Sequence, residues 1–264
     1  MKISIITTTL NSEKYLQDTL ESIKSQYNDD VQYILVDGGS DDDTLQIVEK
    51  YDFVELYHFQ GSTMYEAIDF GFQKANGEIL SWINSDDVYM KDTLQLVLKE
   101  FNNNKIDILS GNLIYIDSNG NELYPYYFWL SNSLFIDVFK DLILSQPATF
   151  FTKDLYQKIG GLSLEYEIVS DRDFFIRAFR EAKVKWISKI LVKFRVHGEN
   201  LSITKREKAI LENNKINLQL NAGPKSSFKN RFLNILGHLT IKMLNPRMLW
   251  FKIRNRTWNL YSGE

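Results

Sequence analysis

The stretch Glu78-Ile-Leu-Ser-Trp-Ile-Asn-Ser-Asp86-Asp87 carries the clearest signal in this chain of 264 residues. An apolar run with strand character, 79–83, is followed closely by two adjacent carboxylates. Such runs are normally buried in the middle of a sheet, and open α/β sheets bind ligands at the carboxyl ends of their strands. Two neighbouring carboxylates repel each other, and a divalent cation would relieve that repulsion because hard cations prefer oxygen ligands. The alternative interpretation is a solvated turn that caps a helix over 91–101.

Strand and helix patterns alternate through the first half of the chain. Strands are expected at 3–8, 33–36, 54–58 and 78–83, and helices at about 12–25, 45–48, 63–75 and 91–101. This alternation predicts an α/β fold with a doubly wound, mostly parallel sheet. The second half is less regular, with short strands expected at 106–109, 113–116, 148–151, 184–187 and 191–196, and a helix at 171–182.

Composition restricts the class of protein. A hydrophobic content of 44% with 25% charged residues is typical of a soluble globular protein. The absence of cysteine excludes a disulfide scaffold and thiol catalysis. The chain has no run of 18 apolar residues, and its N-terminus lacks the features of a signal peptide. We therefore expect a cytoplasmic protein.

The net charge of −3 conceals a basic C-terminus: residues 224–264 contain eight Lys or Arg and one acidic residue. Helical patterns, with Trp and Phe beside basic residues, predict a helical extension over 205–264. Such a segment suits peripheral contact with the inner face of an anionic membrane. Packing on the main domain, or across a homodimer, explains the pattern equally well. Nucleic acid is not an expected partner, because the basic residues are confined to the tail and no recognised module accompanies them.

Three further polar motifs have both a structural and a functional interpretation. Asp37-Gly38-Gly39-Ser40 follows a strand, so its carboxylate and N–H groups would lie beside a nucleotide or form an ordinary turn. Asp171 and Asp173 begin a helix, where they would complement the helix dipole or supply a general base. His197 follows a strand pattern; it would bind a divalent cation or be a surface or core residue.

In combination, the order and spacing of these motifs resemble glycosyltransferase family 2, the large A-type family that uses nucleotide-sugars. The similar segments are Ser4–Asn11, Val36–Thr44, Gly61–Gly71 with Ala75–Glu78, Asn84–Asp87, Gln146–Phe151, Gly160-Gly161, Ser170–Asp173 and Arg195–Ser202. The resemblance covers about residues 3–204. It implies the A-type glycosyltransferase fold, with a catalytic domain over 1–204 and a helical C-terminal appendage. The nucleotide-binding half would cover about 1–115 and the acceptor half about 116–204.

The resemblance also implies roles for individual residues. Asp171 would be the catalytic base, and the ligands of Mn²⁺ or Mg²⁺ would come from Asp86, Asp87 and His197. Donor contacts are expected from Thr8, Thr9, Asn11, Asp37, Gly38, Gly61, Tyr65, Asn84, Ser85 and Asp86. Some positions depart from the family pattern. Asn84 replaces the first Asp of the metal motif, Leu10 and Asp69 replace the usual Tyr and Asn, and Ser170 stands where an acidic residue often precedes the base.

The function implied is inverting transfer of a hexosyl or N-acetylhexosaminyl group from a nucleotide-sugar, expected to be UDP-linked. The acceptor would be a saccharide or a lipid-linked saccharide. One alternative is a catalytically degenerate protein of the same fold that binds nucleotide or partners. A second is a sugar nucleotidyltransferase, although the Gly-rich phosphate loop of such enzymes is absent from residues 7–13. The aromatic segment Tyr124–Trp129 would stack on a sugar, join the core or form a lid.

Overall fold

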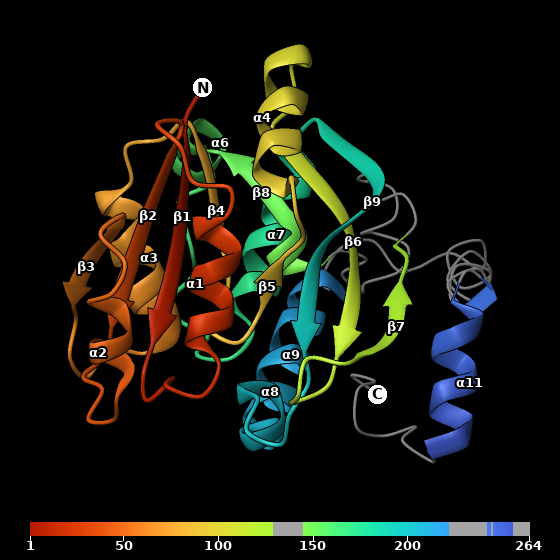
Figure 1. The fold of residues 1–264 in the computed structure, drawn as a ribbon. Helices are drawn as coiled ribbons and strands as arrows, with labels where there is room; N and C mark the ends of the chain where they lie inside the picture. Colours follow the sequence, from red (N-terminus) through yellow and green to blue (C-terminus); the bar gives the residue numbers. More distant parts are fainter. Residues whose placement is uncertain (129–144, 222–241, 244, 256–264) are drawn as a thin grey trace.

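The computed structural model describes residues 1–128, 145–221, 242–243 and 245–255. A nine-stranded mixed sheet forms its centre, in the order β3-β2-β1-β4-β8-β6-β9-β5, with β7 paired to β6 (Figure 1). The strands are β1 (Ile3–Thr9), β2 (Val31–Asp37), β3 (Val54–His58), β4 (Ile79–Trp82), β5 (Val88–Tyr89), β6 (Ile108–Ile116), β7 (Glu122–Tyr126), β8 (Thr149–Thr152) and β9 (Val184–Arg195).

The expected α/β fold is confirmed, and its parallel part is the N-terminal half. Strands β3, β2, β1 and β4 pair in parallel, and all seven residues of β2 are buried because helices cover both faces. The second half is mixed: β8 runs antiparallel to β4 and β6, whereas β9 is parallel to β6. The strands expected at 106–109 and 113–116 form one strand, β6, and those at 184–187 and 191–196 form β9.

Helices cover both faces of the sheet (Figure 1). One face is covered by α1 (Leu16–Lys24), α2 (Thr44–Val48) and α4 (Thr93–Asn103), and the other by α3 (Met64–Lys74), α6 (Lys153–Lys158) and α7 (Ser170–Glu181). Each longer helix carries an apolar stripe at helical spacing, as in α3, where Tyr65, Ile68 and Phe72 are buried. Helix α3 begins at a capping box in which Thr63 and Glu66 bond each other's backbone N–H.

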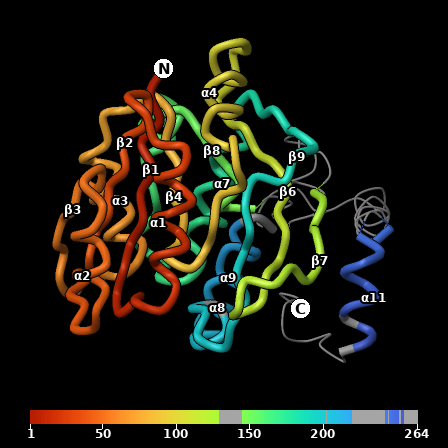
Figure 2. The backbone as a smooth tube through the Cα atoms, in the orientation of Figure 1, coloured from red at the N-terminus to blue at the C-terminus, as the bar shows by residue number. Residues whose placement is uncertain are grey.

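Strands β1, β6 and β9 point their carboxyl ends to the same end of the molecule (Figures 1 and 2). Helix α8 (Leu201–Thr204) lies at this end, and α9 (Arg206–Asn221) follows it. Ile216 of α9 is 2% exposed and belongs to the same apolar cluster as Phe174 of α7. Helix α9 therefore packs on the body that carries the expected catalytic residues.

The last described helix, α11 (Pro246–Asn255), lies beside β7 (Figure 1). The rings of Tyr124 and Phe251 are 4.9 Å apart, and the Asn245 side chain bonds both the N–H and the carbonyl of Tyr127. Most of the helical pattern at 228–243 lies outside the described residues. Within the described ranges, no helix is both long and apolar enough to cross a bilayer. Membrane and dimer contacts of 224–264 stay predictions.

Candidate active site

A cavity of about 930 Å³ opens at the carboxyl ends of the strands. Its lining includes all the expected site residues except Asp37 and Asp87, namely Thr8, Thr9, Asn11, Gly38, Gly61, Tyr65, Asn84, Ser85, Asp86, Asp171 and His197. These residues come from segments that are far apart in the sequence. The fold thus brings the expected donor, metal and base positions into one space.

Asp37 organises the turn at the end of β2 rather than lining the cavity. Its carboxylate accepts hydrogen bonds from the N–H of Gly39 at 3.0 Å and from the N–H and hydroxyl of Ser40 at 3.1 and 2.5 Å. The turn needs glycine because φ of Gly39 is +106°. Burial alone would raise the pKa of Asp37, but the bonds from Ser40, Gly39 and Thr9 lower it below its usual value.

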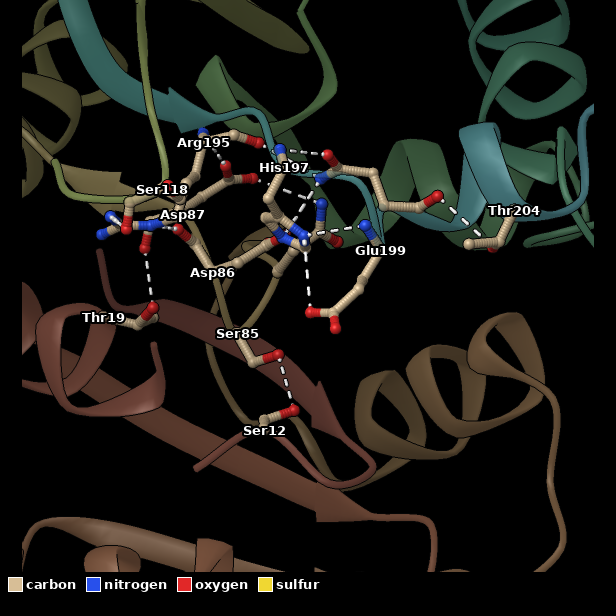
Figure 3. Close-up of polar contacts among 12 residues, drawn as sticks. Ser12, Thr19, Ser85, Asp86, Asp87, Ser118, Arg195, His197, Glu199 and Thr204 are labelled. Carbon is tan, nitrogen blue, oxygen red and sulfur yellow. Dashed lines mark hydrogen bonds and ion pairs between the residues drawn. The ribbon is translucent and has the colours of Figure 1, made fainter. Parts of the chain in front are cut away.

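Further bonds fix the neighbouring loops to this turn. The N–H of Asn11 donates to the Ser40 hydroxyl at 2.9 Å, and the Asn11 side chain accepts from the N–H of Asp41 at 2.9 Å. The hydroxyls of Ser12 and Ser85 lie 3.0 Å apart, which joins the loop after β1 to the segment after β4 (Figure 3). The three loops that would hold a nucleotide therefore form one bonded unit.

Asp86 and His197 both line the cavity, and their side chains point toward each other (Figure 3). The Nε2 atom of His197 lies 2.8 Å from Oδ2 of Asp86, and the Asn200 amide donates to the same oxygen at 3.2 Å. The Tyr15 ring packs against the His197 ring with their centroids 4.9 Å apart. The side chains of Asp86 and His197 are more than four-fifths buried, so their geometry is fixed before any ligand binds.

Asp87 is fully buried and turns away from the cavity. Its carboxylate accepts from the Arg195 N–H at 3.0 Å and from the Asn84 amide at 3.2 Å. Burial raises the pKa of Asp87 well above its ordinary value, and the nearby Asp86 charge adds to the rise. In this arrangement Asp87 connects the end of β4 to the end of β9.

Arg195 strengthens the same connection. Its side chain is 2% exposed, and the guanidinium bonds the Asp18 carboxylate at 2.7 Å. It also donates to the Asp86 carbonyl at 2.9 Å (Figure 3). It also lies over the Tyr15 ring, 4.7 Å from the centroid. The buried arginine therefore holds α1, the end of β4 and the end of β9 together.

The residues around Asp86 suit a divalent cation completed by oxygens of a bound diphosphate. They provide one carboxylate and one imidazole on the cavity surface, which is an acceptable set for Mn²⁺ or Mg²⁺. Within the described ranges, no three His, Cys, Asp or Glu residues gather closely enough to hold an ion alone. Water molecules or the oxygens of a bound diphosphate would complete the coordination.

Asp171 lies in the first turn of α7 and faces the cavity. Burial raises the pKa of its carboxyl above the ordinary value, while the hydroxyl of Tyr65 and the N–H of Arg172 oppose the rise. A carboxylate with a raised pKa is a stronger base, which suits proton removal from a hydroxyl group. Asp173 instead bonds Arg177 at 2.8 Å and lies outside the cavity lining, as the structural interpretation expects.

The segment before Asp171, residues 163–169, is called the base loop here. Its conformation depends on α9, because the Glu212 carboxylate accepts from the N–H groups of Glu167, Ile168 and Val169 at 3.0, 2.9 and 3.3 Å. Arg172 bonds the side chains of Asn213 and Asn217, each at 2.8 Å. Helix α9 thus holds the backbone on both sides of Asp171, the expected base, through the base loop and Arg172.

Several cavity residues were not among the expected site residues. Tyr15, Asn200 and Gln146 all contribute to the wall, and Lys14 and Lys205 add cationic groups. Asn200 and Gln146 lie within motifs quoted for the resemblance, which was the available signal. Glu212 had no sequence signal at all, since its role depends on how α9 folds back onto the base loop.

Two of the residues that depart from the family pattern, Asp69 and Ser170, make hydrogen bonds within the protein. The Asp69 carboxylate accepts a hydrogen bond from the Tyr156 hydroxyl and lies outside the cavity lining. Ser170 is fully buried, and its hydroxyl donates to the Ser163 carbonyl at 2.7 Å across the base loop. Leu10, in contrast, lines the cavity and is 61% exposed.

Solved structures share this fold. TarS from *S. aureus*, residues 1–349 in complex with UDP-GlcNAc, matches with a TM-score of 0.68 and 20% identity, over 92% of this chain and 73% of that chain. The mannosyltransferase PcManGT from *Pyrobaculum calidifontis*, in complex with GDP-Man and Mn²⁺, matches with a TM-score of 0.62 and 13% identity, over 98% of this chain and 76% of that chain. At these identities the likeness concerns the fold.

Curated relatives include an uncharacterized glycosyltransferase of *Rickettsia prowazekii*, 24% identical over 76% of this chain and 66% of the relative. A relative from *Rickettsia conorii* is 26% identical over 75% of this chain and 34% of its own length. The chain therefore spans between about a third and two thirds of these proteins. A PGL/p-HBAD biosynthesis glycosyltransferase of *Mycobacterium tuberculosis* is 31% identical over 67% of this chain and 69% of the relative. The model of glycosyl transferase family 2 matches residues 4–161, and together these findings show that the chain belongs to that family.

Proposed function

We propose that this chain transfers a hexosyl or N-acetylhexosaminyl group from a UDP-sugar to a hydroxyl of a saccharide or lipid-linked saccharide, with inversion. The observation that carries the proposal is that Asp86, His197 and Asp171 line one cavity with the loops after β1, β2 and β4. A departing diphosphate needs a group that neutralises its charge, and an attacking hydroxyl needs a base, both in the same cavity. Asp86 with His197 would serve the diphosphate, and Asp171 would serve the hydroxyl.

The bonded loops after β1 and β2 would bind the nucleotide, with Asp37 holding the turn and Gly38 leaving room for a close approach. Asp86 and His197 would hold Mn²⁺ or Mg²⁺, which would neutralise the charge of the departing diphosphate. Asp171 would accept the proton of the acceptor hydroxyl as the oxygen attacks the sugar carbon from the face opposite the diphosphate. One such displacement breaks the bond to the donor and inverts the sugar carbon.

The choice of UDP rests on analogy with TarS, which is described with UDP-GlcNAc. GDP is the alternative to test, because PcManGT is described with GDP-Man. The direct test is calorimetry of UDP and of GDP, with Mn²⁺ and with EDTA, on the wild type and on Asp86→Ala. We expect metal-dependent binding of UDP that the substitution abolishes. Equal affinity in EDTA and in the variant would contradict the role given to Asp86.

Turnover separates an enzyme from the degenerate alternative. The protein would be incubated with UDP-GlcNAc, UDP-glucose and UDP-galactose, and the release of UDP followed with and without Asp171→Asn. General-base catalysis contributes roughly 10²- to 10⁴-fold, so the variant should lose at least that order while still binding donor. Nucleotide binding without any turnover in the wild type would favour the degenerate alternative.

We also propose that α11 contributes to peripheral contact with an anionic membrane. Trp250 and Ile253 are 60% and 56% exposed, three residues apart on one helix, and the Arg254 guanidinium lies over the Trp250 ring. Basic groups beside a Trp suit the bilayer interface. Vesicles of phosphatidylglycerol should sediment the full-length chain, and Trp250→Gln with Ile253→Gln should reduce this. Equal recovery in the supernatant with and without vesicles would exclude the contact.

A further inference from the structure

One end of the cavity is built from aromatic side chains on adjoining strands. The aromatic wall consists of Tyr115 on β6, Tyr126 and Phe128 at the end of β7, and Phe194 on β9. In the sheet register Tyr115 stands opposite Phe194, while Tyr126 stands opposite Leu113. Side chains two residues apart on a strand point to the same face, so Leu113 and Tyr115 both project into the cavity.

The rings of the wall are in contact with one another. Their centroids lie 5.5 Å apart between Tyr115 and Phe194, 6.2 Å between Tyr115 and Tyr126, and 4.7 Å between Tyr126 and Phe128. The backbone behind them is held as well, since the N–H of Phe128 donates to the buried Asn112 side chain at 2.9 Å. The wall is therefore a preformed surface.

Its position separates it from the nucleotide loops. In the sheet order, β2 and β1 lie on one side of β4 and carry the turn of Asp37 and the loop of Asn11. Strands β6, β9 and β7 lie on the other side of β4, which itself leads to Asp86. A donor that reaches Asp86 from the loops after β1 and β2 would therefore lie on the other side of β4 from the wall, and Asp171 borders the same cavity.

From this geometry we infer that the aromatic wall is the acceptor subsite and that it stacks against a pyranose ring. This inference rests on the proposed transferase function and specifies its acceptor. A pyranose has an apolar face of C–H groups and a rim of hydroxyls. The wall matches both, because its ring faces are apolar while Ser145 and Gln146 supply polar groups in the same cavity.

A lipid chain matches the wall less well. Alkyl chains have no polar rim to satisfy, and they pack equally well on aliphatic side chains. The wall has a single aliphatic neighbour on these strands among the cavity residues, Leu113. The composition therefore favours a ring-shaped, amphipathic ligand over an acyl chain.

The structure also separates the roles within the aromatic segment 124–129. Tyr124 is 3% exposed and contacts α11, so it belongs to the core, whereas Tyr127 is 39% exposed and lies outside the cavity lining. Among the described residues 124–128, only Tyr126 and Phe128 line the cavity, and Trp129 lies outside the described residues. The two-residue period of a strand accounts for Tyr127, which lies between Tyr126 and Phe128, whereas Tyr124 shares their face and packs against Phe251 of α11.

The test uses the full-length protein loaded with UDP and Mn²⁺ and a panel of methyl pyranosides of glucose, galactose, mannose and N-acetylglucosamine. Saturation-transfer NMR would measure which ligand protons contact the protein, and titration would give the affinity. Tyr126→Leu removes the ring but keeps apolar bulk, and Tyr126→Phe keeps the ring. Tyr27→Leu is the matched control, because Tyr27 is exposed and lies outside the cavity lining.

We expect transfer to the ring C–H protons of at least one pyranoside in the wild type. Tyr126→Leu should weaken its binding roughly two- to tenfold, the range of one aromatic contact, while Tyr126→Phe and Tyr27→Leu stay close to the wild type. UDP affinity should be unchanged in all three variants. If the wild type does not bind UDP at all, that result would instead contradict the proposed function itself.

Two results would overturn the inference while leaving the transferase function intact. The first is that UDP binds but no pyranoside shows saturation transfer, or that the pyranoside binds Tyr126→Leu and the wild type with equal affinity. The second comes from octyl glucoside used as a further probe. Saturation confined to its alkyl protons, with none on its ring protons, would contradict contact between the wall and a pyranose ring.

Discussion

Replacing Glu212 with alanine should loosen the base loop without unfolding the donor half. In the structure one carboxylate accepts the N–H groups of three successive residues, Glu167, Ile168 and Val169. Val169 is followed by Ser170 and then by Asp171, so these bonds fix the backbone just before the expected base. The donor loops are held by separate bonds around Asp37 and should keep their conformation.

The magnitude follows from the burial of the amides that would lose their acceptor. An unsatisfied buried donor costs about 1–3 kcal/mol. Ile168 and Val169 are only 7% and 8% exposed, but Glu212 is partly exposed, so water can replace part of the loss. We take about 2 kcal/mol for the loop, near the low end for two amides. Because 1.36 kcal/mol is a factor of ten, their exchange with solvent should accelerate about 30-fold.

Hydrogen–deuterium exchange followed by mass spectrometry measures this without any substrate. The peptide covering 165–171 should exchange faster in Glu212→Ala, while peptides from β1 and β2 remain at wild-type rates. Glu207→Ala is the control, because Glu207 is exposed on the same helix. Once a donor is known, kcat should fall by roughly tenfold or more with donor affinity retained, since small misplacements of a reacting group reduce rates strongly.

Wild-type exchange of 165–171 in Glu212→Ala would refute this reasoning. It would mean that packing of Ile216 and the bonds of Arg172 already hold the loop. Faster exchange in Glu207→Ala as well would show a general weakening of α9 rather than a loss of the three bonds.

Three other outcomes are expected. Asp86→Asn should weaken Mn²⁺-dependent UDP binding at least tenfold, whereas Asp87→Asn should retain it, because the amide oxygen can still accept the Arg195 N–H; calorimetry compares the two. The raised pKa of Asp171 should place an acid limb in the kcat/KM profile above pH 3.8, the ordinary value. Activity is lost as pH falls through that pKa because the base must be ionised, and a limb at or below 3.8 would contradict the assignment. Gly77→Ala should lower stability by about 1–3 kcal/mol, since its Cβ would meet the Lys2 carbonyl at 2.7 Å, while Gly198→Ala has open space; thermal unfolding measures both.

Sequence patterns were sufficient for the N-terminal half because each signal there is local. The apolar run expected as a strand at 33–36 lies within the fully buried β2, and the helix expected at 63–75 corresponds to α3. The end of β4 was recognisable because apolar residues give way to carboxylates. Family resemblance then assigned roles that the residue pattern alone left open.

The rest depended on contacts that no local pattern contains. Val88–Tyr89 is a two-residue strand, and it exists because β9 passes beside it. Asp87 looked like a candidate ligand beside Asp86, yet its side chain turns inward to an N–H that is 108 residues away in sequence. The Asp86 carboxylate contacts His197 while the Asp87 carboxylate accepts the Arg195 N–H, so two neighbouring carboxylates need not share one ligand.

Strand β9 couples the two halves of the cavity. Phe194 at its end belongs to the aromatic wall, Arg195 bonds the Asp86 carbonyl, and His197 reaches the Asp86 carboxylate. A shift of β9 along β6 would therefore move the acceptor wall and the diphosphate end together. The buried Arg195, bonded to Asp18 of α1, opposes such a shift. Under the proposed function, an in-line attack needs a reproducible distance between acceptor hydroxyl and sugar carbon, so a buried arginine at this point would link fold stability to the geometry of transfer.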